Sequence, residues 1–266
     1  IAKLFSISYL LLAIIAFRQV LLSYFNSEKL TLIFSGIIFS SPVLIYYADT
    51  LLPDVFSFAS LLLSASYFYR YVQTNKLIHW LVFTIFLAIA VLIKITALVA
   101  LLSFVGAFFF YSLHQANRAY WQDRRMWFGY LALFLVLVLT IWWYRYAIAY
   151  NTKHHSHIFS TTIRPIWEVD TATRWRIIRL IWEEHLKEIM HPILLVSLLL
   201  ALSALAIKGK ISLFFRYWIP VALVGLSAYF ILWFWVFEVH DYYFIEVLFF
   251  PLTIVALIFQ NARAYL

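Results

Sequence analysis

The sequence predicts an all-α protein, a polytopic bundle of transmembrane helices. Of the 266 residues, 65% are hydrophobic and only 12% are charged, and the mean hydropathy is +0.91. A soluble domain cannot bury that much apolar surface, whereas a bilayer provides an apolar solvent for it. The apolar residues also occur in runs of about 20, the length that one spanning helix needs. The absence of cysteine excludes disulfides and thiolate metal sites.

About nine spans can be placed along the chain, and we expect them to form a single domain over residues 1–266. A signal peptide is not predicted, because the first residues already belong to a span. The fourth and fifth spans meet at Lys94 with almost no loop between them. The expected spans lie near residues 4–25, 30–48, 54–72, 77–93, 95–113, 127–149, 192–207, 216–237 and 242–260.

The short loops indicate how these spans are oriented. Most basic loop residues fall on one side, which the positive-inside rule makes cytoplasmic. Their dispersal over loops favours topology and lipid contact, rather than nucleic-acid binding, as the reason for the net charge of +8. Nine of the twelve acidic residues fall on the opposite, outer side: Asp49, Asp54, Glu168, Asp170, Glu183, Glu184, Glu188, Glu238 and Asp241. Charges in mid-span are nearly absent, which disfavours a channel or an ion-coupled transporter.

The segment 150–191 is the one long connection, and we expect it to be an outer loop that contains an interfacial helix. The helix is predicted to begin at Asp170 or Thr171, either of which is a good N-cap, and to end near Met190. Arginine and glutamate occupy the faces that its apolar residues leave, a pattern typical of a helix that lies in the membrane surface. The apolar stripe consists of Trp175, Ile178, Trp182, Leu186 and Ile189.

Two outer segments carry the candidate catalytic residues. Asp49 and Asp54 lie in the turn before the third span, and His240 and Asp241 lie just before the last one. Simpler interpretations are a helix start capped by Asp54 and an aromatic belt formed by the tyrosines that follow Asp241. Tyr242, Tyr243 and Glu246 continue this second segment at helical spacing, and we expect them to line the same polar cavity.

Basic residues at the outer face are candidates for binding an anionic substrate. Lys94 lies between two spans, and its ammonium suits a phosphate, although a lysine at this depth can also extend to the surface. The loop arginines can bind phosphate through paired N–H groups or can contact lipid headgroups. These are Arg164, Arg174, Arg176 and Arg179. The histidines at positions 154, 155 and 157 lack the spacing of a zinc site, and no metal ligand is assigned.

The order of these features resembles the GT-C glycosyltransferases, and the nearest branch is that of bacterial protein mannosyltransferases and aminoarabinose transferases. The residues that carry the resemblance are the turn from Tyr47 to Pro53-Asp54, the later Leu92-Ile93-Lys94, and His240-Asp241-Tyr242-Tyr243 followed by Pro251. The resemblance covers most of the chain as a hydropathy pattern with a few polar markers.

The resemblance implies transfer of a sugar from a polyprenyl-phosphate donor to a lipid, glycan or protein acceptor. It places the enzyme in the bacterial inner membrane with its active site facing the periplasm or exterior, and the 150–191 loop over the donor cavity. It also implies an inverting displacement, in which a carboxylate deprotonates the acceptor and Lys or Arg stabilises the departing lipid phosphate. Whether a divalent metal cation assists stays open.

The chain departs from the family in one respect. The family's catalytic acid lies in the loop after its first span, and this chain is expected to lack that span and loop. Asp54 would then support a base that lies upstream of Ile1. The alternatives are a membrane transporter or lipid flippase, and a non-catalytic membrane scaffold.

Overall fold

The computed structural model describes residues 2–115, 124–156, 159, 163–208, 211 and 213–262. These residues form helices and the turns between them, with no strand among them, which confirms the all-α class for this part of the chain. The longer helices are α1 (Ala2–Phe25), α2 (Glu28–Phe39), α4 (Pro53–Thr74), α5 (Leu77–Ile93), α6 (Ala97–Gln115), α8 (Arg124–His154), α9 (Thr171–Leu180), α11 (Pro192–Ile207), α12 (Leu213–Leu232) and α14 (Phe249–Ala262). The shorter ones are α3 (Pro42–Tyr47), α10 (Leu186–Ile189) and α13 (Phe244–Val247), together with 3-10 turns at Ile166–Glu168, Phe234–Glu238 and Asp241–Tyr243 and a π-helical turn at Ile181–His185.

Four helical segments within the described ranges are long and apolar enough to cross a membrane. They are Lys3–Phe25, Trp127–His154, Phe215–Leu232 and Asp241–Ile258. A fifth results if Thr171–Ile189 and Pro192–Ile207, which are bent by 87° to each other, are counted as one broken span. The chain therefore has the helices of a membrane protein. Helix length does not confirm a count of nine, because the expected span 30–48 is divided into α2 and α3 and because α5 has only 17 residues.

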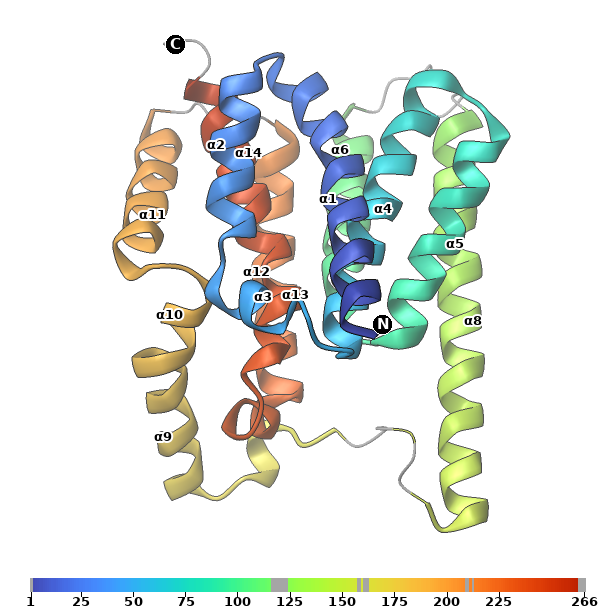
Figure 1. Ribbon diagram of the computed structural model, residues 1–266, viewed down its shortest axis with the longest axis vertical. Helices are drawn as coiled ribbons and strands as arrows, with labels where there is room; N and C mark the ends of the chain where they lie inside the picture. The colour runs from blue at the N-terminus through green and yellow to red at the C-terminus, as the bar shows by residue number, and fades with distance from the viewer. Residues whose placement is uncertain are drawn as a thin grey trace.

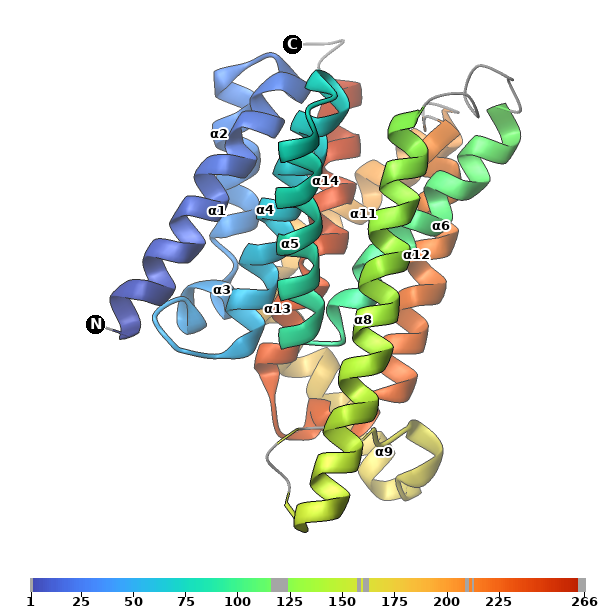
Figure 2. The same ribbon diagram turned by 90° about the vertical axis from the view of Figure 1, so that its right-hand side faces the viewer.

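The helices place the predicted inner and outer connections at opposite ends of the bundle (Figure 1). The turns α1–α2 and α4–α5 lie at the end of the bundle where α14 ends, whereas the α3–α4 turn, the α5–α6 break and α9 lie toward the other end. Helix α8 reaches down as far as α9, well past the lower ends of α4 and α5 (Figure 2). Its 31 residues correspond to about 46 Å at 1.5 Å per residue, more than the roughly 30 Å of a hydrocarbon core.

Helix α4 is central because its small polar residues permit close helix contacts on two sides. The Ser57 hydroxyl donates a hydrogen bond to the Ala90 carbonyl at 3.0 Å, which joins α4 to α5. Ser64 donates to the Phe83 carbonyl of the same helix at 3.3 Å. On the other side, the hydroxyl of Tyr9 in α1 lies 2.8 Å from that of Ser60. Small hydroxyl residues at helix contacts are typical of membrane bundles, and here they place the start of α4 firmly beside the end of α5.

The helical segment 171–190 begins where the sequence predicts, and the face that it turns toward the protein is not the predicted apolar stripe. Asp170 caps α9 by accepting a hydrogen bond from the Thr173 amide at 3.0 Å. The residues turned inward are Ile177, His185 and Ile189, which are buried, with Ile181 partly buried. Of the predicted stripe, Leu186 is partly buried and Ile189 buried, but Trp175, Ile178 and Trp182 are exposed. A π-helical turn lies within the segment at Ile181–His185, and every fourth residue from Ile177 to Ile189 faces the protein.

Candidate functional site

The site is built around a break between two helices. Helix α5 ends at Ile93 and α6 begins at Ala97, and the three residues between them are each bonded to a different helix. The Lys94 ammonium pairs with a carboxylate of α4, the Ile95 amide donates to a hydroxyl of α8, and the Thr96 hydroxyl donates to a carboxylate of α13. The break therefore joins three helices that are distant in sequence, and it fixes the position of Lys94.

The acidic partner of Lys94 is Asp54, in the first turn of α4. Pro53 occupies the first position of this helix, where its missing N–H leaves no hydrogen bond unmade, and Asp54 follows it inward. Lys94 Nζ lies 2.7 Å from Asp54 Oδ1. The Asp54 side chain is 0% exposed and that of Lys94 is 11% exposed, so the ion pair is almost wholly withdrawn from solvent.

Two tyrosine rings complete the surroundings of the Lys94 ammonium. Nζ lies 3.4 Å from the centre of the Tyr243 ring and 5.2 Å from that of Tyr242. An ammonium over an aromatic face is attracted by the ring quadrupole, most strongly where water is excluded. The hydroxyl of Tyr229 in α12 donates to the Tyr243 carbonyl at 2.9 Å, which holds this segment against the bundle.

Glu246 lies deeper than the sequence suggests. Its residue is 4% exposed, one carboxylate oxygen accepts the Thr96 hydrogen bond, and the other has no protein partner among the described residues. Asp54 Oδ2 is likewise buried without such a partner. The interior thus encloses two carboxyl groups and one ammonium. Glu246 contacts the base of the site rather than lining an open cavity.

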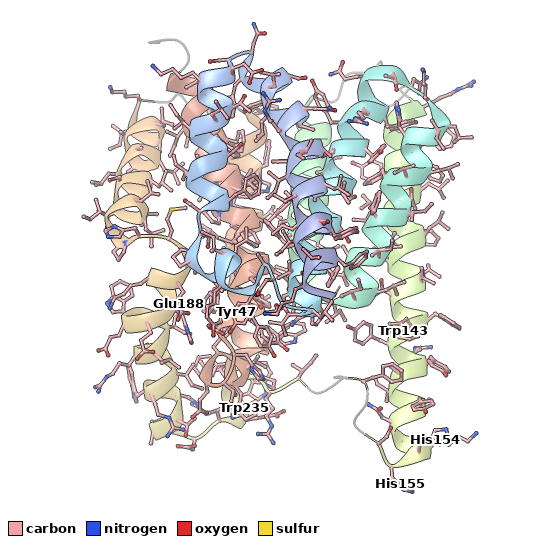
Figure 3. The ribbon with its side chains drawn as sticks, viewed as in Figure 1. Tyr47, Trp143, His154, His155, Glu188 and Trp235 are labelled. Atoms are coloured by element: carbon pink, nitrogen blue, oxygen red, sulfur yellow. The ribbon has the colours of Figure 1, made fainter. Side chains whose placement is uncertain are left out.

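The segment before α13 brings His240 and Asp241 to the same cluster. The Tyr47 hydroxyl, at the end of α3, donates a hydrogen bond to Asp241 Oδ1. The Tyr47 and Tyr242 rings meet edge-on at 5.7 Å, and the His240 ring lies 4.8 Å from the Tyr242 ring. Figure 3 shows Tyr47 at the lower end of the bundle, close to Glu188 of α10. Asp241 and His240 are partly exposed, so they form the surface of a cluster whose buried base is the Asp54–Lys94 pair.

The remaining candidate residues lie outside this cluster. Asp49 forms a surface ion pair with Lys3 at 2.8 Å. Arg164 stacks its guanidinium 4.6 Å from the Trp235 ring. The three arginines of α9 have partners of their own. Arg176 pairs with Glu238, Arg179 Nε lies 4.0 Å from Glu183, and Arg174 donates to the carbonyls of Val169 and Trp167.

A cleft of about 260 Å³ lies beside the helix break, between α6 and α8. It is lined by Ile95, Leu98, Leu137, Thr140, Ile141, Tyr144, Arg145 and Ile148, of which only the threonine, the tyrosine and the arginine are polar. Sites for whole small molecules usually enclose roughly 300–1,000 Å³, so this cleft suits part of a chain rather than a sugar. Ile95 belongs to the break itself, so the cleft and the polar cluster share a wall.

Several contributors were missed from the sequence. Tyr47, Thr96 and Tyr144 each bond to the cluster or to the break, and His185 fastens α10 to the neighbouring turn. Only Tyr47 carried a signal, because it precedes the acidic turn. A single hydroxyl within an apolar helix, such as that of Tyr144, gives no sequence pattern that distinguishes it from an interfacial tyrosine.

The described residues contain no group of three or more His, Asp or Glu side chains arranged to hold a metal ion. His154 stacks on Tyr150 at 4.4 Å, and His155 has a left-handed backbone with φ of 47°. The histidine at position 157 lies outside the described residues. Comparisons with protein-family models, with curated proteins and with solved structures found nothing that matches this chain.

Proposed function

We propose that the chain is an inverting GT-C-type glycosyltransferase that moves a sugar from a polyprenyl-phosphate donor to a lipid, glycan or protein acceptor. The proposal includes about nine spans in a bacterial inner membrane, with the cluster and an interfacial α9 at the periplasmic or exterior face. The observation that carries it is the Asp54–Lys94 pair at the end of the bundle, adjoining an apolar cleft. A lipid phosphate needs a cation and an apolar channel side by side, and this arrangement supplies both.

Each group has a role in an inverting displacement. Asp241, partly exposed and held by Tyr47, takes the proton of the acceptor hydroxyl or amine, with His240 beside it. The acceptor atom bonds to the anomeric carbon as the bond from that carbon to the phosphate oxygen breaks. The Lys94 ammonium stabilises the charge on the departing phosphate, while Asp54 and Tyr243 hold the ammonium in place.

The test uses the purified chain in lipid nanodiscs with polyprenyl-phosphate mannose and polyprenyl-phosphate aminoarabinose as donors. Mass spectrometry follows release of the sugar-free polyprenyl phosphate. The parent should release it from at least one donor, and Lys94→Met and Asp241→Asn should reduce the rate at least tenfold. Lys3→Met is the matched control, because it removes a lysine from an exposed ion pair. No release by the parent, or equal rates in all variants, would contradict the proposal.

A lipid flippase is the second candidate, and the interrupted helix pair α5–α6 favours it. A break beside buried charged groups is also the arrangement in which transporters bind their cargo. The two functions differ in product. In sealed vesicles a flippase moves the donor lipid between leaflets with its sugar still attached, whereas a transferase yields sugar-free lipid phosphate.

A further inference from the structure

Tyr144 of α8 contacts both the apolar cleft and the helix break that carries Lys94. Its side chain lines the apolar cleft, and its hydroxyl accepts a hydrogen bond of 3.2 Å from the Ile95 amide. Ile95 directly follows Lys94, so this bond holds the backbone on which the lysine is carried. Neither neighbouring aromatic of α8 has this double position, because Trp143 packs against Phe159, and Trp142 is exposed.

The occupant of the cleft follows from its chemistry and its neighbours. Its walls are mostly aliphatic and its volume is small, which fits a segment of hydrocarbon chain. Lys94 directly precedes Ile95 of the lining, and its ammonium favours an anionic headgroup on that chain. A prenyl chain that ends in a phosphate has both properties.

We propose that Tyr144 is a positioning residue, which holds the Ile95 amide so that the Lys94 ammonium binds the phosphate of a lipid whose chain lies in the cleft. The inference rests on the proposed function and assigns to this site a part that the proposal leaves open. A chain in the cleft packs on the Tyr144 ring and keeps its hydroxyl on the Ile95 amide. The 94–96 break is then held with the Lys94 ammonium toward the phosphate. Without that bond the break keeps its links to Asp54 and Glu246, but the backbone next to Lys94 loses its link to α8, and the ammonium is held less precisely.

The test compares farnesyl phosphate with farnesol, which share a chain and differ in the phosphate. Dissociation constants are measured with the purified full chain in nanodiscs of zwitterionic lipid. The parent should prefer the phosphate, and Lys94→Met should abolish the preference. Tyr144→Phe should reduce the preference by about threefold to tenfold, the factor that one hydrogen bond supplies. Its affinity for farnesol should stay within twofold of the parent, because the ring still lines the cleft.

Ile141→Trp is the control, because it fills the cleft without touching the hydrogen bond. This variant should weaken the binding of farnesyl phosphate and of farnesol equally, and it should leave the preference for the phosphate intact. If Tyr144→Phe keeps the full preference, or weakens both ligands equally, the inference is wrong while the proposed function stands. If the parent itself does not distinguish phosphate from alcohol, the phosphate site of the proposed function fails, and the inference fails with it.

Discussion

The Lys94 ammonium lies 2.7 Å from the Asp54 carboxylate, although the two residues are 40 positions apart in the chain. One ends a helix and the other begins one, and the contact between α4 and α5 brings them together. Burial of both groups makes the pair a fixed element of the interior, not a surface ion pair. Each partner is therefore needed to keep the other's charge compensated.

We expect Asp54→Asn and Lys94→Met to destabilise the protein strongly when introduced singly. Removing one member of a buried pair leaves an uncompensated charge and costs roughly 3–5 kcal/mol. The double variant should recover part of this loss, because Asp54 and Lys94 are removed together and neither is left without the other, although the buried Glu246 carboxyl group remains. Thermal unfolding in detergent gives the midpoint temperature of each single variant and of the double variant. The exposed pair is the control: Lys3→Met should leave the midpoint unchanged, and single variants of the buried pair as stable as the parent would contradict the expectation.

Much of the architecture could be predicted from the sequence because apolar run length is a direct physical signal. The ends of α1, α4, α5 and α11 fall close to the predicted bounds. The sequence also placed Asp54, Lys94, His240 and Asp241 at ends of apolar runs on one side, and the structure brings these residues into one cluster. What the sequence could not show is the pairing, because contact between particular helices depends on packing that no local pattern encodes.

The errors of prediction have specific causes. The expected span 30–48 is broken at Ser41, where Pro42 begins a new helix. The segment 171–190 was expected to be one regular helix, whereas a π-helical turn at Ile181–His185 interrupts it. The partners of the α9 arginines could not be predicted, because Arg176 bonds to Glu238, which is 62 positions away, and Arg174 bonds to backbone carbonyls.

We expect Glu246→Gln to be tolerated and Thr96→Val to be harmful. The amide of glutamine keeps an oxygen to accept the Thr96 hydrogen bond and removes one of two carboxyl groups that share a single ammonium. Valine leaves the buried Glu246 side chain without that bond, a loss of about 1–3 kcal/mol. Thermal midpoints of the two variants provide the comparison. A lower midpoint for Glu246→Gln than for Thr96→Val would show that the negative charge is itself stabilising.

The proposed orientation can be checked with single cysteines, because the chain has none of its own. Lys76 lies in the exposed turn between α4 and α5, and Ser156 follows the end of α8 at the opposite end of the bundle. An impermeant thiol reagent should label Ser156→Cys in intact cells and should label Lys76→Cys only after the membrane is opened. The reverse pattern would invert the topology and place the cluster on the cytoplasmic side.

The start of α9 should weaken in acid because of its cap. The hydrogen bond from the Thr173 amide lowers the pKa of Asp170 below its ordinary value of 3.8. A lowered folded-state pKa gives stability that is present above the unfolded value and lost as pH falls through the folded one. Hydrogen-exchange protection factors in the first turn of α9 should therefore fall below pH 4. Asp170→Asn keeps an acceptor without the charge, so it should lose this pH dependence. Equal pH dependence in both proteins would assign the effect to another group.

His185 should control how firmly the 166–190 segment is held to the bundle. Its Nδ1 lies 3.0 Å from Glu188 Oε2, and its Nε2 lies 2.9 Å from the Phe237 carbonyl oxygen. Both ring nitrogens thus face acceptors, and the ring packs 5.0 Å from that of Phe244. Replacement by alanine leaves the buried carbonyl without this partner, at a cost of about 1–3 kcal/mol.

A cysteine at Ile177, which is fully buried in the inward face of α9, reports local opening. Its labelling by a maleimide should accelerate in the His185→Ala background by roughly 5- to 150-fold, the factor that corresponds to that cost when opening is local. His191→Ala is the matched control, because His191 is exposed and the described hydrogen bond of its side chain is to the nearby Ile193 amide. It should leave the rate unchanged. If His185→Ala also leaves it unchanged, the segment is held by apolar packing and the Arg176–Glu238 pair, and the histidine only fills space.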